Sequence, residues 1–145
     1  MTLVLVGTTA RMSFSFRFVL WVMLHIFSYE SFVRGKIKYN YYEPSEQVIK
    51  AALDRAMETP KYAAYACFTK FTKNYDIRDK VSEIKVPTLI LVGEKDKSTP
   101  VAMSKYLNSQ IEGSKLHIVP DCKHMVMNDK SEELNEIMGA FIRLA

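Results

Sequence analysis

The stretch VPTLILVGEKDKSTP at residues 86–100 decides the fold, together with SKLHIVPDCKH at residues 114–124. The first opens on a continuous apolar run from Val86 to Val92, which is typical of a strand buried in a parallel sheet. The second contains another expected strand, KLHIV at residues 115–119. We expect one helix between them, from Pro100 to Gln110, and a closing helix from Ser131, where apolar residues recur at helical spacing. This alternation of strand and helix predicts an α/β fold over residues 81–145.

The N-terminal residues predict one more strand, followed by a less regular region. Residues 2–7, TLVLVG, again form a short apolar run that indicates a buried parallel strand. Residues 8–80 lean towards helix, with helices expected after Pro44 and from Pro60 to Phe71, and with a loop at residues 39–42. Because no Gly/Ser-rich linker interrupts the sequence, we expect residues 1–145 to form a single domain.

Composition and charge exclude several classes of protein. The chain has 145 residues, 48% of them apolar and 25% charged, which is the profile of a globular domain. Its net charge of +4 is too small and too scattered for a nucleic-acid-binding surface. The longest apolar stretch, residues 18–29, is shorter than the roughly 20 residues that a membrane-spanning helix needs. Two Cys give neither a disulfide framework nor metal-ligand spacing. We therefore expect a cytoplasmic protein with no metal, no cofactor, no nucleic-acid partner and no membrane partner.

Two titratable residues follow the two C-terminal strands. Asp96 lies in the loop after the first, and His124 lies in the loop after the second. Neighbouring parallel strands bring the loops at their carboxyl ends together, so the two side chains should lie next to each other. An Asp beside a His fixes the tautomer of the imidazole and stabilises its cation, as a general base requires.

The sequence around this pair resembles the C-terminal part of the α/β-hydrolase family. The resemblance rests on residues 86–100, on SKLHIVPDCKHMVMNDKSEELNEIMGAFI at residues 114–142, and on LVLVGTTARM at residues 3–12. It implies a partial α/β-hydrolase fold: the last parallel strands of the sheet with covering helices, and a helical lid insertion at residues 8–80. It also implies that Asp96 is the acid and His124 the base of a Ser-His-Asp type triad. Met125, directly after His124, is a candidate substrate-binding residue.

The sequence departs from this family in two respects. Lys123 stands where the family has a Gly before the His, which predicts either a shifted loop or a second cation close to His124. The nucleophile motif G-x-S-x-G occurs nowhere in the chain. We therefore expect a truncated α/β hydrolase whose parent activity is hydrolysis of carboxylic esters, or of related acyl or C–X bonds, with a small ester-like substrate bound once the missing half is supplied. The alternative is a catalytically inactive remnant that acts as an oligomeric or interaction module, pairing with a second copy through an exposed sheet edge.

Other reactive residues are weaker candidates for a role in the chemistry. Ser13 and Ser15 follow the first strand but lack the nucleophile motif. Cys122 leaves the same loop as His124, which is the wrong side for attack on a bound carbonyl. For His117, inside an expected strand, and His25, inside an apolar stretch, we expect structural roles. No nucleophile is identified in this sequence.

Overall fold

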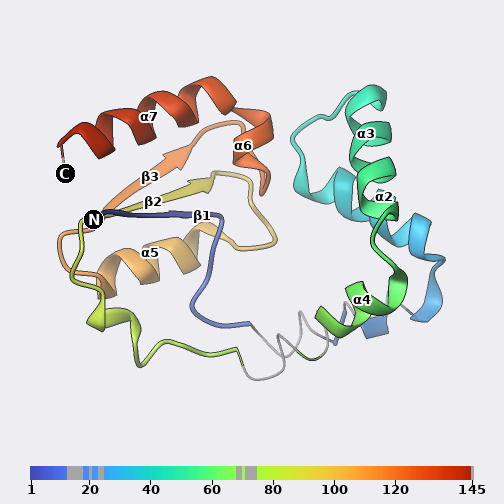
Figure 1. Ribbon diagram of the computed structural model, residues 1–145, viewed down its shortest axis with the longest axis horizontal. Helices are drawn as coiled ribbons and strands as arrows, with labels where there is room; N and C mark the ends of the chain where they lie inside the picture. Colours follow the sequence, from blue (N-terminus) through green and yellow to red (C-terminus); the bar gives the residue numbers. More distant parts are fainter. Residues whose placement is uncertain (13–17, 20, 23–24, 68–69, 71–74, 145) are drawn as a thin grey trace. The chain divides into compact units, whose positions relative to one another are not determined.

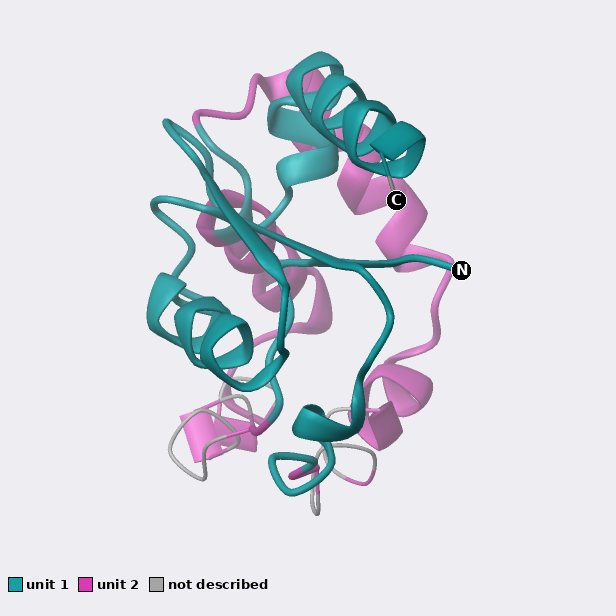
Figure 2. Ribbon diagram, turned by 90° about the vertical axis from the view of Figure 1, so that its left-hand side faces the viewer, with its two compact units in different colours: residues 1–10, 40–42, 77–145 teal, residues 11–39, 43–76 magenta. Residues whose placement is uncertain are grey.

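The computed structural model describes residues 1–145 except 13–17, 20, 23–24, 68–69, 71–74 and 145. The chain divides into two compact units (Figure 2). Unit 1 comprises Met1–Ala10, Asn40–Tyr42 and Ile77–Ala145. Unit 2 comprises Arg11–Tyr39 and Glu43–Asp76. The short segment 40–42 therefore clusters with the sheet, although it lies between two helices of unit 2 in the sequence.

Unit 1 is built on a three-stranded parallel sheet in the order β1-β2-β3 (Figure 1). The strands are β1 (Leu3–Val6), β2 (Thr88–Gly93) and β3 (Lys115–Val119). This confirms the parallel α/β sheet predicted from the sequence. Strand β1 is shorter than the predicted residues 2–7, because Gly7 adopts a φ of +54° that no strand residue has. Strand β2 begins after Pro87, which lacks the N–H that the ladder needs.

One face of the sheet packs against α5 (Val101–Gln110) and the short 3₁₀ helix η2 (Val81–Glu83). Ile90, at the centre of β2, points to this face and is fully buried. Its buried neighbours in the cluster are Ala10, Val81, Leu107 and Ile111. Helix α5 was predicted from residue 100, and Pro100 instead forms its N-cap.

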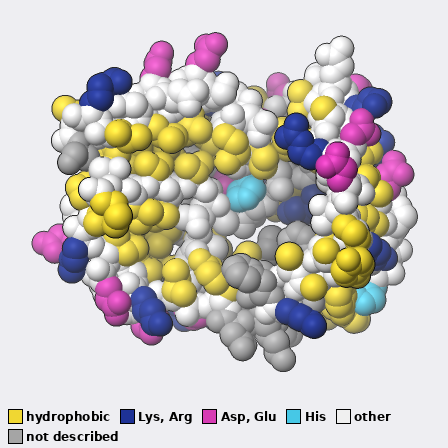
Figure 3. All heavy atoms as spheres, viewed as in Figure 1, with side chains coloured by type: hydrophobic (Ala, Val, Ile, Leu, Met, Phe, Trp, Pro, Cys, Tyr) yellow, Lys and Arg dark blue, Asp and Glu magenta, His cyan; other side chains and the backbone are white. Residues whose placement is uncertain are grey.

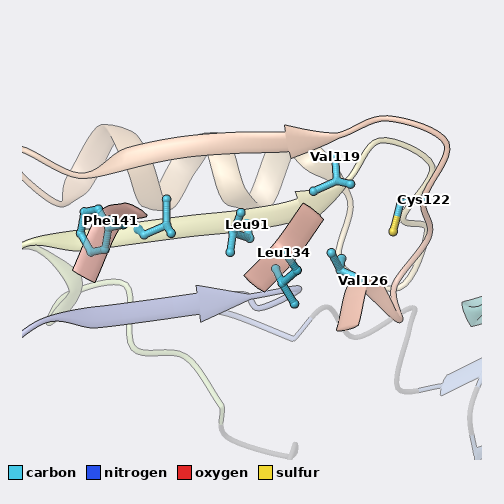
Figure 4. Close-up of a cluster of buried hydrophobic side chains, with 7 residues drawn as sticks. Leu91, Val119, Cys122, Val126, Leu134 and Phe141 are labelled. Carbon is cyan, nitrogen blue, oxygen red and sulfur yellow. The ribbon is translucent and has the colours of Figure 1, made fainter. Parts of the chain in front are cut away.

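The other face of the sheet packs against α6 (Val126–Asp129) and α7 (Ser131–Leu144), on the side opposite α5 (Figure 1). Leu91 points to this face because successive strand residues alternate between faces. Figure 4 shows its buried cluster, whose members are Leu89, Leu91, Val119, Cys122, Val126, Leu134 and Phe141. Helix α7 begins at Ser131, as predicted, and α6 is a short turn that the sequence pattern did not predict.

Among the residues that the structure describes, the secondary structure of unit 2 is mainly helical, with one antiparallel bridge between Arg11 and Asp76. Its named helices are α2 (Tyr29–Asn40, the last residue of which clusters with unit 1), α3 (Glu46–Met57) and α4 (Lys61–Ala66). The predicted helix start after Pro44 is confirmed: the Ser45 hydroxyl caps α3 by accepting from the N–H of Val48 at 3.3 Å. The predicted loop at residues 39–42 is wrong in its first half, because α2 continues through Asn40. No described helix is long and apolar enough to cross a lipid bilayer.

Candidate active site

Two loops leave the carboxyl ends of β2 and β3 and lie against each other. We name them the Asp96 loop (residues 94–100) and the His124 loop (residues 120–125). The first is joined to the end of β3 by the Glu94 N–H, which donates to the Val119 carbonyl at 2.8 Å. The Lys95 N–H donates to the Cys122 carbonyl at 2.9 Å. Gly93 makes this approach possible, since a Cβ there would lie 2.1 Å from the Lys123 carbonyl oxygen.

Asp96 and His124 form a hydrogen-bonded pair between the loops. Nδ1 of His124 lies 2.9 Å from Oδ2 of Asp96. The Asp96 side chain is completely buried, whereas 27% of the His124 side chain is exposed. The pair predicted from the sequence is therefore confirmed, with the carboxylate behind the imidazole and the imidazole towards solvent.

The Asp96 carboxylate also accepts three hydrogen bonds from the residues that follow it. The N–H groups of Ser98 and Thr99 donate to Oδ1 at 2.8 and 2.9 Å, and the Thr99 hydroxyl donates to Oδ2 at 2.8 Å. Burial favours the neutral acid, but the hydrogen bonds from His124 and Thr99 outweigh it and lower the pKa of Asp96 below its ordinary value of 3.8. Asp96 is therefore an ionised acceptor at neutral pH.

The ionised carboxylate determines which nitrogen of His124 carries the proton. Because Asp96 can only accept, Nδ1 of His124 must donate, and a neutral imidazole then has its lone pair on Nε2. The Thr99 hydroxyl lies 3.2 Å from the same Nδ1. Among the described residues, the His124 side chain makes its hydrogen bonds at Nδ1. The Nε2 atom is thus the nitrogen whose lone pair can take up a proton.

Gly7 and Asp129 complete the surroundings of His124, and sequence reasoning missed both. A Cβ at Gly7, whose φ is +54°, would lie 3.3 Å from Nδ1 of His124. Asp129 accepts from the Lys123 N–H at 3.4 Å, so it anchors the loop from α6. Lys123 has a negative φ, and the left-handed position of this loop is Asp121, at +46°. A lysine in place of the family's glycine is therefore accommodated without backbone strain.

Thr99 and the backbone of Ser98 were also missed, although the sequence held a signal for them. In the run from Asp96 to Pro100, an Asp is followed by Ser and Thr just before a helix. This pattern is typical of a carboxylate that accepts from the N–H groups two and three residues later. The observed bonds from Ser98 and Thr99 are of this kind.

The structure gives inert surroundings to two of the weaker candidates. Cys122 is buried, and burial, followed by the nearby charge of Asp129, raises its pKa to about 12. It is therefore a neutral thiol at pH 7 and a poor nucleophile. His117 faces α7, with Nε2 3.8 Å from a carboxylate oxygen of Glu133, and its structural role stays a prediction.

The four remaining candidates are His25, Met125, Ser13 and Ser15. His25 is in unit 2, where its Nδ1 lies 2.7 Å from the Trp21 carbonyl oxygen. Met125 is half-buried in the His124 loop, and its substrate-binding role stays a prediction. Ser13 and Ser15 lie outside the described residues. Among the residues that are described, no group of three or more His, Cys, Asp or Glu side chains could hold a metal ion.

Comparison with known proteins gives matches to hydrolases. A proline iminopeptidase from Thermoplasma volcanium is 39% identical over 70 residues, which cover 48% of this chain and 23% of that protein. A 2-hydroxy-6-oxononadienedioate/2-hydroxy-6-oxononatrienedioate hydrolase from Klebsiella pneumoniae is 33% identical over 70 residues, covering 48% of this chain and 24% of that protein. The matched segment thus spans about a quarter of the length of these relatives.

Solved structures agree with the fold over nearly the whole chain. An esterase from Exiguobacterium antarcticum superposes with a TM-score of 0.87 at 18% identity, covering 98% of this chain and 57% of that one. A bromoperoxidase from Bacillus anthracis gives 0.86 at 19% identity, covering 98% and 58%. The chain spans just over half the length of each of these structures. The family model described as serine aminopeptidase, S33, matches residues 2–131. With most of its length matched by that model, this chain belongs to the serine aminopeptidase S33 family of α/β hydrolases.

Proposed function

We propose that Asp96 and His124 are the acid and base of a Ser-His-Asp type triad that hydrolyses small carboxylic esters or related acyl bonds. The observation that carries the proposal is the 2.9 Å hydrogen bond from a part-exposed imidazole to a fully buried, ionised carboxylate. This arrangement fixes the Nδ1–H tautomer and stabilises the imidazolium that forms when Nε2 takes up a proton. The serine is supplied by polypeptide outside these 145 residues, because the sequence has no G-x-S-x-G.

In the proposed reaction, His124 moves one proton in each half of the cycle. Nε2 removes the proton from the serine hydroxyl as its oxygen attacks the acyl carbon, and then gives it to the leaving group as the acyl bond breaks. In the second half, Nε2 removes a proton from water as the water oxygen attacks the acyl carbon. The proton then passes to the serine oxygen as the acyl–serine bond breaks, which releases the acid product and the free serine. Asp96 stays ionised throughout and holds the imidazole. The donors that stabilise the tetrahedral oxyanion come with the serine-bearing segment.

The open edge of β1 supports this source for the serine. Strand β1 pairs with β2 on one side, and no strand among the described residues pairs with its other side. Figure 3 shows a band of hydrophobic side chains between α7 and the sheet. The partly buried hydrophobic residues that pack against the core cluster on the α7 side of the sheet are Val4, Val6, Ile137 and Met138. A further strand at this edge would complete their burial.

The test begins with the DNA upstream of the codon for Met1. We expect an open reading frame that encodes a strand, a G-x-S-x-G turn and a helix. The protein extended by this segment should hydrolyse p-nitrophenyl acetate or butyrate and react with a fluorophosphonate probe at the new serine. The 145-residue chain should do neither.

Variants of the extended protein assign the roles. His124→Ala should abolish turnover, and Asp96→Asn should lower kcat by about 10⁴-fold, because the neutral amide favours the wrong tautomer. His117→Ala and Asp54→Asn are matched controls, at a histidine that faces α7 and at an exposed carboxylate in α3. Activity that survives His124→Ala would refute the proposal, as would fluorophosphonate labelling of the 145-residue chain.

The same edge separates the proposal from the alternative of a non-catalytic module. If β1 serves to pair two copies, the 145-residue chain sediments as a dimer, and stop codons interrupt every reading frame upstream. If β1 receives a serine-bearing strand, the extended protein has no open edge there and does not require a second copy. Sedimentation of both proteins therefore distinguishes the two functions.

A further inference from the structure

Residues 40–42, which we name the strap, lie on both loops of the site. The side chain of Asn40 accepts a hydrogen bond at Oδ1 from the Ser98 hydroxyl, at 2.7 Å. Its backbone carbonyl accepts from the Met125 N–H at 3.1 Å. One residue is thus bonded to the Asp96 loop through its side chain and to the His124 loop through its backbone.

Tyr42 makes a second set of bonds at the other end of the strap. Its N–H donates to the Asp129 carboxylate at 3.0 Å, and this carboxylate also accepts from the His124 loop. Its hydroxyl donates to Asp121 at 3.3 Å and accepts from Lys95 at 3.2 Å. The Lys95 ammonium also lies 4.6 Å from the centre of the Tyr42 ring. The strap therefore contacts both loops at both of its ends.

Apart from the contacts of His124 with Asp96 and Thr99, the direct bonds between the two loops hold the part of each loop that is nearest to the sheet. The bonds of Glu94 and Lys95 to the His124 side lie next to the ends of β2 and β3. Ser98 and Met125 lie further along, on the far side of Asp96 and His124. Asn40 joins the loops at this second level. Bonds before and after Asp96 and His124 along each loop restrict the movement of these two side chains.

Backbone strain is concentrated at the same place. Among the described residues, Glu43 and Asp121 are the two non-glycine residues with a positive φ, at +42° and +46°. Glu43 directly follows the strap, and Asp121 accepts from Tyr42. Such conformations are unfavourable for residues with a Cβ and persist where the surrounding contacts impose them. The contacts of the strap therefore hold Glu43 and Asp121 in these unfavourable backbone conformations.

We propose that Asn40 is a positioning residue that holds the Asp96 and His124 loops in register through Ser98 and Met125. Any effect of Asn40 on catalysis rests on the proposed function. Its effect on the hydrogen bond between Asp96 and His124 does not. Loss of the Asn40 side chain frees the distal part of the Asp96 loop, and the hydrogen bond between His124 and Asp96 then opens more often.

The test measures this hydrogen bond directly in the 145-residue chain. The Nδ1 proton of His124 is observed by proton NMR, and its exchange with solvent reports the opening of the pair. We expect Asn40→Ala to speed this exchange about five-fold, the effect of one neutral hydrogen bond. Ser98→Ala should do the same, because it removes the donor while keeping the Ser98 N–H that binds Asp96. The double variant should be no faster than either single variant, since both remove one bond.

Two further variants separate positioning from general destabilisation. Asn40→Asp keeps an acceptor for the Ser98 hydroxyl and should restore slow exchange. Tyr41→Phe changes the strap at a side chain whose hydroxyl makes no hydrogen bond among the described residues, and exchange should not change. The inference is overturned if Asn40→Ala and Ser98→Ala both leave the exchange rate at the wild-type value. It is equally overturned if Tyr41→Phe speeds exchange as much as Asn40→Ala. These outcomes do not depend on turnover, so a failure of the proposed function is read separately, from His124→Ala in the extended protein.

Discussion

Gly93 stands where β2 meets the His124 loop, and its replacement by alanine is the sharpest test of how the site is built. A Cβ at residue 93 would lie 2.1 Å from the Lys123 carbonyl oxygen and 2.6 Å from that of Cys122. Both atoms belong to the backbone, so no side-chain rotation can relieve the clash. We expect Gly93→Ala to push the His124 loop away from the Asp96 loop.

The size of the effect follows from the distances. To reach an ordinary contact of 3.4 Å, the carbonyl oxygen of Lys123 must retreat by about 1.3 Å and that of Cys122 by about 0.8 Å. The bond from the Lys95 N–H to the Cys122 carbonyl, now 2.9 Å, would then lengthen beyond hydrogen-bonding distance. Overpacking costs about 1–3 kcal/mol and a lost hydrogen bond about 1 kcal/mol. The free energy of unfolding of unit 1 should therefore fall by about 2–4 kcal/mol.

Hydrogen exchange of the β2 and β3 amides measures the stability of unit 1, and two other glycines are matched controls. Gly113→Ala has open space and a φ of +71°, so it tests backbone strain alone, at about 1 kcal/mol. Gly35→Ala has open space within α2, where alanine should stabilise the helix by up to about 1 kcal/mol. The reasoning is refuted if the β2 and β3 amides are as well protected from exchange in Gly93→Ala as they are in Gly113→Ala.

Two further predictions follow from the titratable groups of unit 1. The folded state holds the pKa of Asp96 below 3.8, so the unfolded chain binds this proton at a higher pH than the folded chain does. The contribution of Asp96 to the free energy of unfolding is complete above about pH 5 and is lost as the pH falls through 3.8 to the pKa of the folded state. Denaturant titrations from pH 6 to pH 2 should show this loss of stability. An equally steep loss in Asp96→Asn would contradict the prediction. Cys67 is exposed and Cys122 is buried, with a pKa of about 12. Mass spectrometry after treatment with iodoacetamide at pH 7.5 should find one adduct on the native chain, at Cys67, and two in denaturant; rapid native labelling of Cys122 would contradict the burial of the thiol.

The sheet and the pair could be predicted because short-range patterns determine both. A continuous apolar run predicts a strand buried on both faces, and Ile90 and Leu91 do lie in clusters on opposite faces. Parallel strands joined by one helix bring their carboxyl ends together. The loops at residues 96 and 124 therefore had to meet, whatever the rest of the chain does.

The strap could not be predicted because its bonds join residues far apart in the sequence. Asn40 bonds to a residue 58 positions away, and Tyr42 to one 87 positions away. No periodicity or capping pattern encodes such a contact. The prediction of a loop at residues 39–42 named no partner for Tyr42, whose ring packs beside the Lys95 ammonium. Local composition described the residues of the strap but not their partners.

Gly7 links the open edge of the sheet to the proposed chemistry. Its φ of +54° turns the chain sharply at the end of β1, and the absent side chain leaves the Nδ1–Cε1 edge of the imidazole against the backbone. A parallel strand added to the open edge of β1 would end about 4.8 Å beyond Gly7, one strand spacing away. A Cβ at residue 7 would lie 3.3 Å from Nδ1 and 3.4 Å from Cε1 of His124, so a side chain there would press on the imidazole that the proposed serine needs. Glycine at residue 7 therefore suits the proposed chemistry by its small size as well as by its conformation.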